Sequence, residues 1–183
     1  GIALALMAKV LGVHMVLVMP ENSTIERVKT MRAYGAKVIL TSKELGIEGS
    51  RDYALKLKYK KGYFRLNQFD NPDNSKAHFK TTGPEIWRDT EGQVTHFIAA
   101  MGTTGTIMGV SDYLKGQNKE IKIIGAQPKD GAKIPGIRKW PQEYLPAIFN
   151  ATKVDQVIEV NEEEAKAMTQ RLASEEGIFA GMS

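Results

Sequence analysis

An apolar stretch followed directly by a loop of glycines and threonines constrains this chain more than any other feature of its sequence. Residues 94–101, Val-Thr-His-Phe-Ile-Ala-Ala-Met, have the length and composition of a buried strand. Residues 102–106, Gly-Thr-Thr-Gly-Thr, follow at once, and a helix is predicted to begin within 104–107 and to run to about Lys115. The sequence therefore predicts a strand, a tight turn and a helix in direct succession.

The loop at 102–106 has the composition of an anion-binding site. Glycines let the backbone approach an anion closely, and the free N–H groups at the start of a helix favour negative charge. No lysine follows as in a Walker A loop, and the spacing differs from the G-x-G-x-x-G of dinucleotide sites. A single phosphate is the ligand that fits best. A tight turn without a ligand is the alternative, and these residues alone do not separate the two.

Composition excludes several classes of site. The 183 residues suffice for one core or two small lobes. The absence of cysteine excludes disulfides and thiolate sites among them, and agrees with the reducing cytoplasm, where we expect the protein. The three histidines lack metal-ligand spacing, so no metal is expected. With 25 basic and 21 acidic residues and no long apolar run, we expect neither nucleic acid nor a membrane as partner.

Short apolar runs alternate with helical patterns along the chain, which predicts an α/β fold with parallel sheets wrapped by helices. Ser23 with Glu26, and Asn161 with Glu164, form predicted capping boxes at two helix starts. The expected strands are 14–19, 37–40, 63–66, 94–100, 121–127 and 154–160. The expected helices are 2–11, Ser23 to about Gly35, 47–60, 75–89 with a break or kink at Gly83-Pro84, 104–115, and 161 to about 176.

Two irregular segments divide this rhythm. The polar loop at 68–74 predicts a boundary that leaves residues 1–70 in one lobe and 71–183 in the other. Residues 128–150 contain four prolines but also buried-type side chains such as Ile134 and Trp140, so we expect an ordered, functional loop. The chain begins in an apolar helical pattern without a cap and stops just after a turn, so we expect it to be an internal fragment of a longer protein.

Four motifs together resemble the cysteine synthases, the O-acetylserine sulfhydrylases among fold-type II pyridoxal-phosphate enzymes. The resemblance runs in order over the whole chain, and it implies the tryptophan synthase β-like fold with two lobes. Residues 134–141, Ile-Pro-Gly-Ile-Arg-Lys-Trp-Pro, are closest to the B-type enzyme, cysteine synthase B. The motifs are Gln68-Phe69-x-Asn71-Pro72, Thr81-Thr82-Gly83-Pro84-Glu85-Ile86-Trp87, Met101-Gly102-Thr103-Thr104-Gly105-Thr106 and Gly177-Ile178-Phe179-Ala180-Gly181-Met182-Ser183.

The resemblance implies pyridoxal 5′-phosphate (PLP) as cofactor and assigns its ligands. Its phosphate would lie on Gly102, Thr103, Thr104, Gly105 and Thr106, in agreement with the anion site argued above. Ser183 would contact the pyridine nitrogen, and Gln68 and Gly136 would contact the amino-acid substrate. Taken without the family, Ser183 and Gly136 are ordinary turn residues, and Gln68 is an ordinary loop residue.

The resemblance also implies the reaction, which joins O-acetylserine to sulfide or thiosulfate through an aminoacrylate intermediate to give cysteine or S-sulfocysteine. Arg138 would favour an anionic sulfur donor such as thiosulfate, because a guanidinium binds anions by charge and by paired hydrogen bonds. A surface arginine beside Lys139 is the alternative for Arg138. The resemblance does not decide between sulfide and thiosulfate as the physiological donor.

The lysine that forms the Schiff base is implied to lie before Gly1, so the chain holds no assigned catalytic residue and should be inactive by itself. The resemblance further implies a homodimer, with residues 1–70 in the smaller, mobile lobe. Two other readings stay open: another fold-type II enzyme, such as a cystathionine β-synthase-like enzyme or a serine/threonine dehydratase, and a non-catalytic paralogue that binds a phosphate or a partner.

Overall fold

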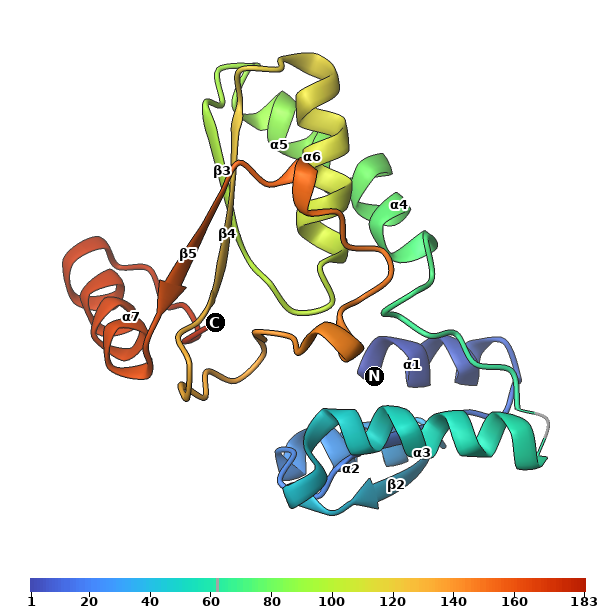
Figure 1. The fold of residues 1–183 in the computed structure, drawn as a ribbon. Helices are drawn as coiled ribbons and strands as arrows, with labels where there is room; N and C mark the ends of the chain where they lie inside the picture. Colours follow the sequence, from blue (N-terminus) through green and yellow to red (C-terminus); the bar gives the residue numbers. More distant parts are fainter. Residues whose placement is uncertain (62) are drawn as a thin grey trace. The chain divides into compact units, whose positions relative to one another are not determined.

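The computed structural model describes residues 1–61 and 63–183, which form two compact units, Gly1–Leu66 and Asn67–Ser183 (Figure 1). Each unit has its own parallel sheet with helices packed against it. Among the described residues, no helix combines the length and the apolar character needed to cross a bilayer. The two units are described separately.

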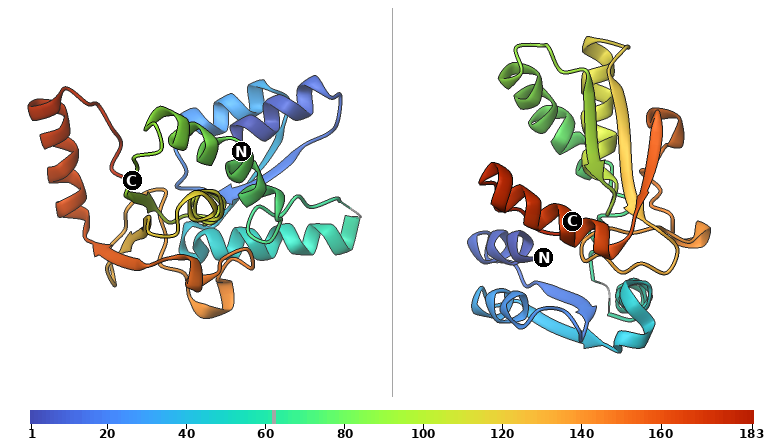
Figure 2. Two further views of the ribbon diagram at one scale, coloured as in Figure 1. Left: turned by 90° about the horizontal axis from the view of Figure 1, so that it is seen from above. Right: turned by 90° about the vertical axis from the view of Figure 1, so that its left-hand side faces the viewer.

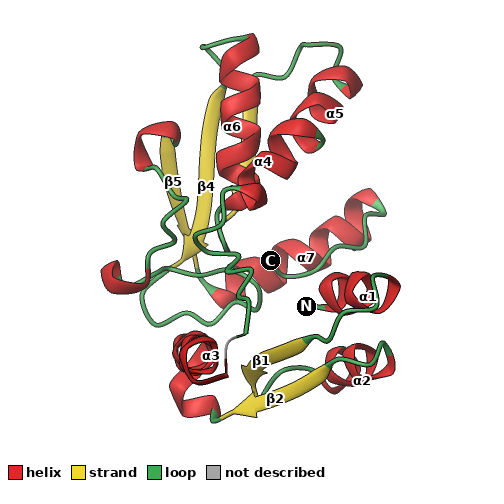
Figure 3. Ribbon diagram, turned by 90° about the vertical axis from the view of Figure 1, so that its right-hand side faces the viewer, coloured by secondary structure: helices red, strands yellow, loops and turns green. Residues whose placement is uncertain are grey.

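The first unit is a two-stranded sheet between helices. Strands β1 (Val16–Pro20) and β2 (Lys37–Thr41) pair in parallel, with Val16 opposite Lys37. Helices α1 (Ile2–Val10) and α2 (Ile25–Ala33) cover one face, and α3 (Gly46–Lys61), preceded by a 3-10 turn at Lys43–Leu45, covers the other (Figure 3). The result is the three-layer arrangement predicted from the alternating pattern.

The core of the first unit lies under α1 and α2. Ala5, Met31 and Ala36 are buried there, and the side chains of Leu17 and Val38 pack against them from the strands. On the other face, a cavity of about 270 Å³ lies between α3 and the sheet, lined by residues that include Tyr53 and Lys56. It contains none of the residues predicted to form a site.

The second unit is built on a three-stranded parallel sheet in the order β3-β4-β5. Ile98 of β3 lies opposite Ile124 of β4, and Ala126 of β4 lies opposite Ile158 of β5. Figure 2 shows β3 and β4 side by side along their length. The elements are α4 (Asp73–Lys80), α5 (Thr82–Asp89), β3 (His96–Ala100), α6 (Gly105–Gln117), β4 (Lys122–Pro128), 3-10 turns at Gln142–Tyr144 and Ala151–Lys153, β5 (Gln156–Val160) and α7 (Glu162–Glu176).

Helix α6 is the central helix of the second unit. Its apolar side chains, among them Ile107, Val110 and Leu114, are fully buried against the sheet with Ile123 of β4. Helix α4 packs on α6 at Gly109, where a Cβ atom would clash with the carbonyl oxygen of Ser75. This close approach fixes α4 beside the first turns of α6, which is where the predicted anion site lies.

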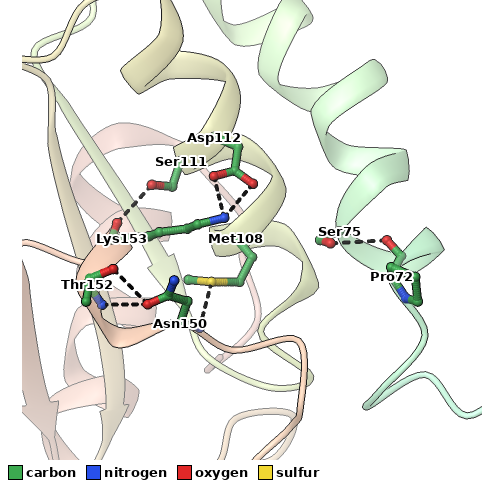
Figure 4. Close-up of polar contacts among 8 residues, drawn as sticks. All are labelled: Pro72, Ser75, Met108, Ser111, Asp112, Asn150, Thr152 and Lys153. Atoms are coloured by element: carbon green, nitrogen blue, oxygen red, sulfur yellow. Dashed lines mark hydrogen bonds and ion pairs between the residues drawn. The ribbon is translucent and has the colours of Figure 1, made fainter.

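Polar contacts hold the 3-10 turn at Ala151–Lys153 on the flank of α6 (Figure 4). The Ser111 hydroxyl donates to the carbonyl oxygen of Lys153 at 2.8 Å, and the ammonium group of Lys153 lies 2.6 Å from the carboxylate of Asp112. The backbone N–H of Asn150 contacts the sulfur of Met108 at 3.2 Å. These contacts lead the chain into β5, the last strand of the sheet.

Several local predictions are confirmed. Asn161 and Glu164 form the predicted capping box of α7, with both reciprocal hydrogen bonds present, and α7 ends at Gly177 in the left-handed conformation (φ 69°). The helix predicted at 75–89 is interrupted, but the interruption lies at Thr81, between α4 and α5, two residues before the predicted break or kink at Gly83-Pro84. Pro84 lies in the first turn of α5. A backbone N–H in that turn has no acceptor within the helix, so proline, which lacks the N–H, loses no helical hydrogen bond there.

Two local predictions are wrong. Residues 63–66 form no strand, because a strand needs a neighbouring strand for its hydrogen bonds, and β1 and β2 pair only with each other among the described residues. The capping box of Ser23 with Glu26 is also absent. The backbone N–H of Ser23 donates to Pro20 in the preceding turn at 3.1 Å, so the cap position passes to Thr24.

Candidate functional site

The loop between β3 and α6 has the geometry of an anion cradle. The first helical hydrogen bond of α6 runs from the N–H of Met108 to the carbonyl oxygen of Thr104 at 3.0 Å. The N–H groups of Thr106 and Ile107 therefore lie at the start of the helix without an acceptor inside it. The positive end of the dipole of this 13-residue helix lies at the same place. This end of α6 favours an anion.

Thr104 is the most unusual residue of the cradle. It occupies the cap position of α6 in the left-handed conformation (φ 68°), which β-branched residues rarely adopt. Its side chain is 5% exposed, and its hydroxyl oxygen is one of the buried polar atoms that find no hydrogen-bond partner among the described residues. A buried hydroxyl without a partner is unfavourable unless a ligand supplies one.

The Thr103 hydroxyl is fixed by a residue of α4. The side-chain amide of Asn74 donates to the hydroxyl oxygen of Thr103 at 3.0 Å and to the carbonyl oxygen of Gln68 at 2.6 Å. The N–H of Gly105 donates to the same Thr103 oxygen over a longer distance, 3.4 Å. Gln68, predicted as a substrate residue, is thereby joined to the cradle through Asn74.

The hydroxyl of Thr106 is contacted by His78, a second residue of α4. Nε2 of His78 lies 3.2 Å from the hydroxyl oxygen of Thr106, and Nδ1 lies 2.9 Å from the hydroxyl oxygen of Thr82. A neutral imidazole has one donor and one acceptor nitrogen, so both contacts can be satisfied together. His78 thus connects the cradle to the start of α5.

The segment that holds Arg138 is fastened to the end of β3. The N–H of Arg138 donates to the carbonyl oxygen of Met101 at 2.8 Å, and the indole N–H of Trp140 donates to the carbonyl oxygen of Gly102 at 2.7 Å. The ring of Trp140 also meets Phe69 edge to face, with centroids 5.4 Å apart. These contacts hold the long loop beside the end of β3. Arg138 as a residue is exposed, and its guanidinium donates to the carbonyl oxygen of Ile137 at 3.2 Å.

Three of the predicted site residues, Gly102, Gly136 and Ser183, lie in a chain of close contacts. The carbonyl oxygen of Gly136 is 2.9 Å from the position that a Cβ atom on Gly102 would occupy. A Cβ atom on Gly136 would in turn lie 3.3 Å from the Cβ atom of Ser183. Gly136 has φ 96°, a conformation suited to glycine. Glycine is required at 102 and 136 because the two backbones and Ser183 approach so closely.

Lys139 ties the same loop to β5. Its ammonium group lies 2.8 Å from the carboxylate of Asp130 and 2.7 Å from that of Glu159. Hydrogen bonds to Asp130 and Glu159 raise the pKa of Lys139, and those from Lys139 and Gln127 lower the pKa of Glu159. The lysine next to Arg138 is therefore held charged in an ion-pair network.

The cradle fits a phosphate group. It combines the start of a long helix, a buried Thr104 hydroxyl that has no partner in residues 1–61 and 63–183, and further hydroxyls at Thr103 and Thr106. A Cβ atom on Gly105 would collide with the side chain of Asn74, so only glycine lets the backbone of the cradle lie this close to Asn74. These features are those expected of a site for a phosphate held by backbone and hydroxyl donors.

Comparison with known proteins agrees with this geometry. A family model described as pyridoxal-phosphate dependent enzyme matches residues 1–183. The chain belongs to this family. It is 56% identical to cysteine synthase B of Pseudomonas aeruginosa and 52% identical to cysteine synthase B of Escherichia coli, over all of its 183 residues. It covers 61% and 60% of those two proteins, so it spans about three fifths of their length.

The fold agrees with solved structures of the same family. The crystal structure of a cysteine synthase from Entamoeba histolytica superimposes with a TM-score of 0.88 at 35% identity, covering 99% of this chain and 56% of that one. The predicted α/β fold of the fold-type II pyridoxal-phosphate enzymes is therefore confirmed, as is the resemblance to cysteine synthase B.

The structure brings all nine predicted site residues into the second unit, around the start of α6. It also adds Asn74, His78 and Trp140, for which the sequence predicts no role in the site; Trp140 is predicted only as a buried-type side chain of the 128–150 loop. In the sequence, Asn74 is an ordinary residue for the first turn of a helix. The three histidines lack metal-ligand spacing and show no other pattern. The contacts of Asn74, His78 and Trp140 join segments about thirty to forty residues apart, so no local pattern in the sequence marks them.

Proposed function

We propose that the whole protein is a PLP-dependent cysteine synthase that breaks the Cβ–O bond of O-acetylserine and forms a Cβ–S bond to sulfide or thiosulfate. Acetate leaves, and cysteine or S-sulfocysteine is the product. The observation that carries the proposal is the anion cradle of α6, whose Thr104 hydroxyl finds no partner within the described part of the chain, in a chain 52–56% identical to three cysteine synthase B proteins.

The residues that would hold the cofactor are those of the cradle and Ser183. The phosphate would accept hydrogen bonds from the backbone and hydroxyls of residues 102–106. When bound, PLP supplies an electron-withdrawing ring that stabilises negative charge at the α-carbon of the amino acid. A neutral hydroxyl from Ser183 at the pyridine nitrogen does not force that nitrogen to be protonated, which suits a reaction in which acetate departs readily.

The substrate would be bound beside the cradle. The side-chain amide of Gln68 can donate to the carboxylate of O-acetylserine without adding charge. Gly136 leaves room for the amino acid, because it presents no side chain. The contact from Asn74 to the carbonyl oxygen of Gln68 supports this placement, since it holds the backbone of Gln68 next to Thr103.

Arg138 is proposed to favour thiosulfate. Its backbone N–H donates to the carbonyl oxygen of Met101, next to the cradle, and the residue is exposed, so its guanidinium is open to an anionic donor. We expect Arg138→Ala to lower kcat/KM for thiosulfate more than for sulfide. Lys133→Ala removes a positive charge from an exposed residue of the same loop and should affect both donors equally. Equal losses for both donors in Arg138→Ala would contradict this role.

The amine that reacts with the cofactor is proposed to come from a lysine before Gly1, as the resemblance implies. None of the lysines in this chain is assigned to that step. Residues 1–70 are proposed to belong to a smaller lobe that moves on substrate binding, and 71–183 to the larger cofactor-binding lobe. The separation of two compact units at Leu66 and Asn67 supports this division. A homodimer is expected on the resemblance alone.

The visible absorbance spectrum of the whole protein tests the proposal. A PLP-derived band that shifts when O-acetylserine is added, and returns when sulfide or thiosulfate is added, is the expected result. A cofactor band that responds to serine or threonine but not to O-acetylserine would favour another fold-type II enzyme. Absence of any cofactor band after incubation with PLP would favour a non-catalytic paralogue.

A further inference from the structure

The neighbours of the Thr103 hydroxyl determine which hydrogen bonds it accepts and which one it is left to donate. A hydroxyl oxygen can accept two hydrogen bonds and donate one. In the structure the oxygen accepts from Asn74 at 3.0 Å and from the N–H of Gly105 at 3.4 Å. With both acceptor positions in use, the hydrogen of the Thr103 hydroxyl is left to donate to another group. An anion at the start of α6 is an acceptor of the right charge.

The orientation of the Asn74 amide is itself fixed. Its nitrogen lies 2.6 Å from the carbonyl oxygen of Gln68, which can only accept a hydrogen bond. The NH₂ end must therefore face Gln68, and its second hydrogen is then available for Thr103. The oxygen of the amide lies against Gly105, in the space that a Cβ atom there would take. The amide cannot be reversed without placing two acceptors against each other.

We infer that Asn74 is a positioning residue for the cofactor phosphate. It makes the hydroxyl of Thr103 a donor to that phosphate, and it uses the carbonyl oxygen of Gln68 to hold its own amide in the required orientation. Asn74 acts through Thr103 and does not itself contact the cofactor. The inference rests on the proposed function, because it takes the anion in the cradle to be the phosphate of PLP.

The isosteric variant Asn74→Asp tests the inference most sharply. A carboxylate in this place cannot donate to either partner, and it would accept the hydrogen of the Thr103 hydroxyl that otherwise goes to the phosphate. We expect the Kd of the whole protein for PLP to rise on the order of tenfold to a hundredfold. Pyridoxal, which lacks the phosphate, should bind the variant and the wild type with similar affinity. The readout is therefore the difference between the affinities for PLP and for pyridoxal, which depends on the phosphate and requires no measurement of activity.

Asn74→Ala separates loss of the donor from the added charge. It leaves the Thr103 hydroxyl free to rotate, so a smaller rise in the Kd for PLP, about tenfold, is expected. The effect should vanish in a Thr103→Val background, because Asn74 then has no hydroxyl to orient. Two interacting residues show this kind of non-additivity, whereas independent effects add.

Asn150→Asp is the matched control. The side-chain oxygen of Asn150 accepts from the N–H and the hydroxyl of Thr152, and a carboxylate can accept both equally well. This variant should bind PLP as the wild type does, and its thermal unfolding midpoint without cofactor should match that of the wild type.

The outcomes separate the inference from the proposed function. If the wild type binds PLP and Asn74→Asp binds it equally well, or if the effects of Asn74→Ala and Thr103→Val add, the positioning role is wrong while the proposed function stands. If the Kd values of Asn74→Asp for PLP and pyridoxal rise by the same factor, the role at the phosphate is also wrong. If the wild type binds no PLP, the proposed function fails and the inference fails with it.

Discussion

The carbonyl oxygen of Gly136 lies 2.9 Å from the position that a Cβ atom on Gly102 would occupy. The contact joins the first residue of the anion cradle to the loop that carries Arg138. A neighbouring backbone cannot rotate away as a flexible side chain can, so a methyl group at 102 would have to push the loop aside.

Gly102→Ala is therefore expected to be destabilising. The free energy of unfolding of the whole protein without cofactor, measured in urea, should fall by about 1–3 kcal/mol, and the Kd for PLP should rise. Gly181→Ala is the control, because a Cβ atom at Gly181 would meet no atom of the described residues within 4 Å. A Gly102→Ala variant as stable as Gly181→Ala would mean that the two loops are not in contact.

Two glycines of α6 are expected to respond to alanine with opposite signs. A Cβ atom on Gly109 would collide with the backbone of α4, whereas one on Gly116 would have no atom within 4 Å in the part of the chain that the structure describes. Gly109→Ala should lower the free energy of unfolding by about 1–3 kcal/mol. Gly116→Ala should raise it by up to about 1 kcal/mol, because alanine favours the helix. Urea denaturation of both variants measures the difference, and equal effects would contradict the packing of α4 on α6.

Asp155 should make the stability of the second unit depend on pH in the acid range. A hydrogen bond from Lys115, joined by one from the N–H of Ile123 at 2.7 Å, lowers the pKa of Asp155. A group whose pKa is lowered by folding stabilises the protein above its unfolded pKa, and this stabilisation is lost as the pH falls through the folded pKa. The stability difference between wild type and Asp155→Asn should therefore be largest near neutral pH and shrink on acidification.

Urea unfolding of both proteins at several pH values between neutrality and the acid range measures this difference. Asp89→Asn is a suitable control, because the carboxylate of Asp89 pairs with an exposed arginine, Arg88, and such pairs contribute little. A difference between wild type and Asp155→Asn that grows as the pH falls would contradict the assignment.

Lys139 is expected to hold the Arg138 segment in place. It pairs with Asp130 and Glu159, which raise its pKa, so the network should persist below the ordinary lysine pKa and weaken only as the pH rises through the raised value. In Lys139→Met the amide hydrogen of Arg138, which is bonded to Met101, should exchange with solvent faster than in the wild type. Lys133→Met should leave this exchange rate unchanged. The same rate in both variants would show that the ion pairs do not restrain the loop.

Local sequence patterns predicted much of the fold, because the signals involved lie within a few residues of one another. The strand at His96–Ala100, the glycine and threonine turn and α6 follow each other directly, and the capping box of α7 spans four residues. The turn at the start of α6 could be predicted for the same reason, since a loop at the start of a helix is defined by adjacent residues, while its binding of an anion remains a prediction.

Features that depend on distant partners could not be predicted in this way. A strand at 63–66 was expected from its side chains, but a strand exists only where another strand receives its hydrogen bonds. Asn74 and Trp140 contact Thr103 and Gly102 across long stretches of chain, and their own neighbours in the sequence give no sign of it. The predicted roles of Gln68, Arg138 and Ser183 rest on the family, and they remain predictions.

The Thr104→Val variant tests whether the start of α6 holds the phosphate of PLP. Valine has the shape of threonine and the same β-branching, so the strain at φ 68° is unchanged. Because the buried Thr104 hydroxyl has no hydrogen-bond partner among the described residues, its removal should not lower the stability of the protein without cofactor.

The measurement is the Kd of the whole protein for PLP, taken together with the thermal unfolding midpoint of the cofactor-free form, in wild type and Thr104→Val. We expect Thr104→Val to raise the Kd for PLP about tenfold or more, with an unchanged or higher unfolding midpoint. A wild-type Kd in Thr104→Val, accompanied by a lower unfolding midpoint, would show that the hydroxyl serves the fold and would contradict the assignment of the cradle to the cofactor phosphate.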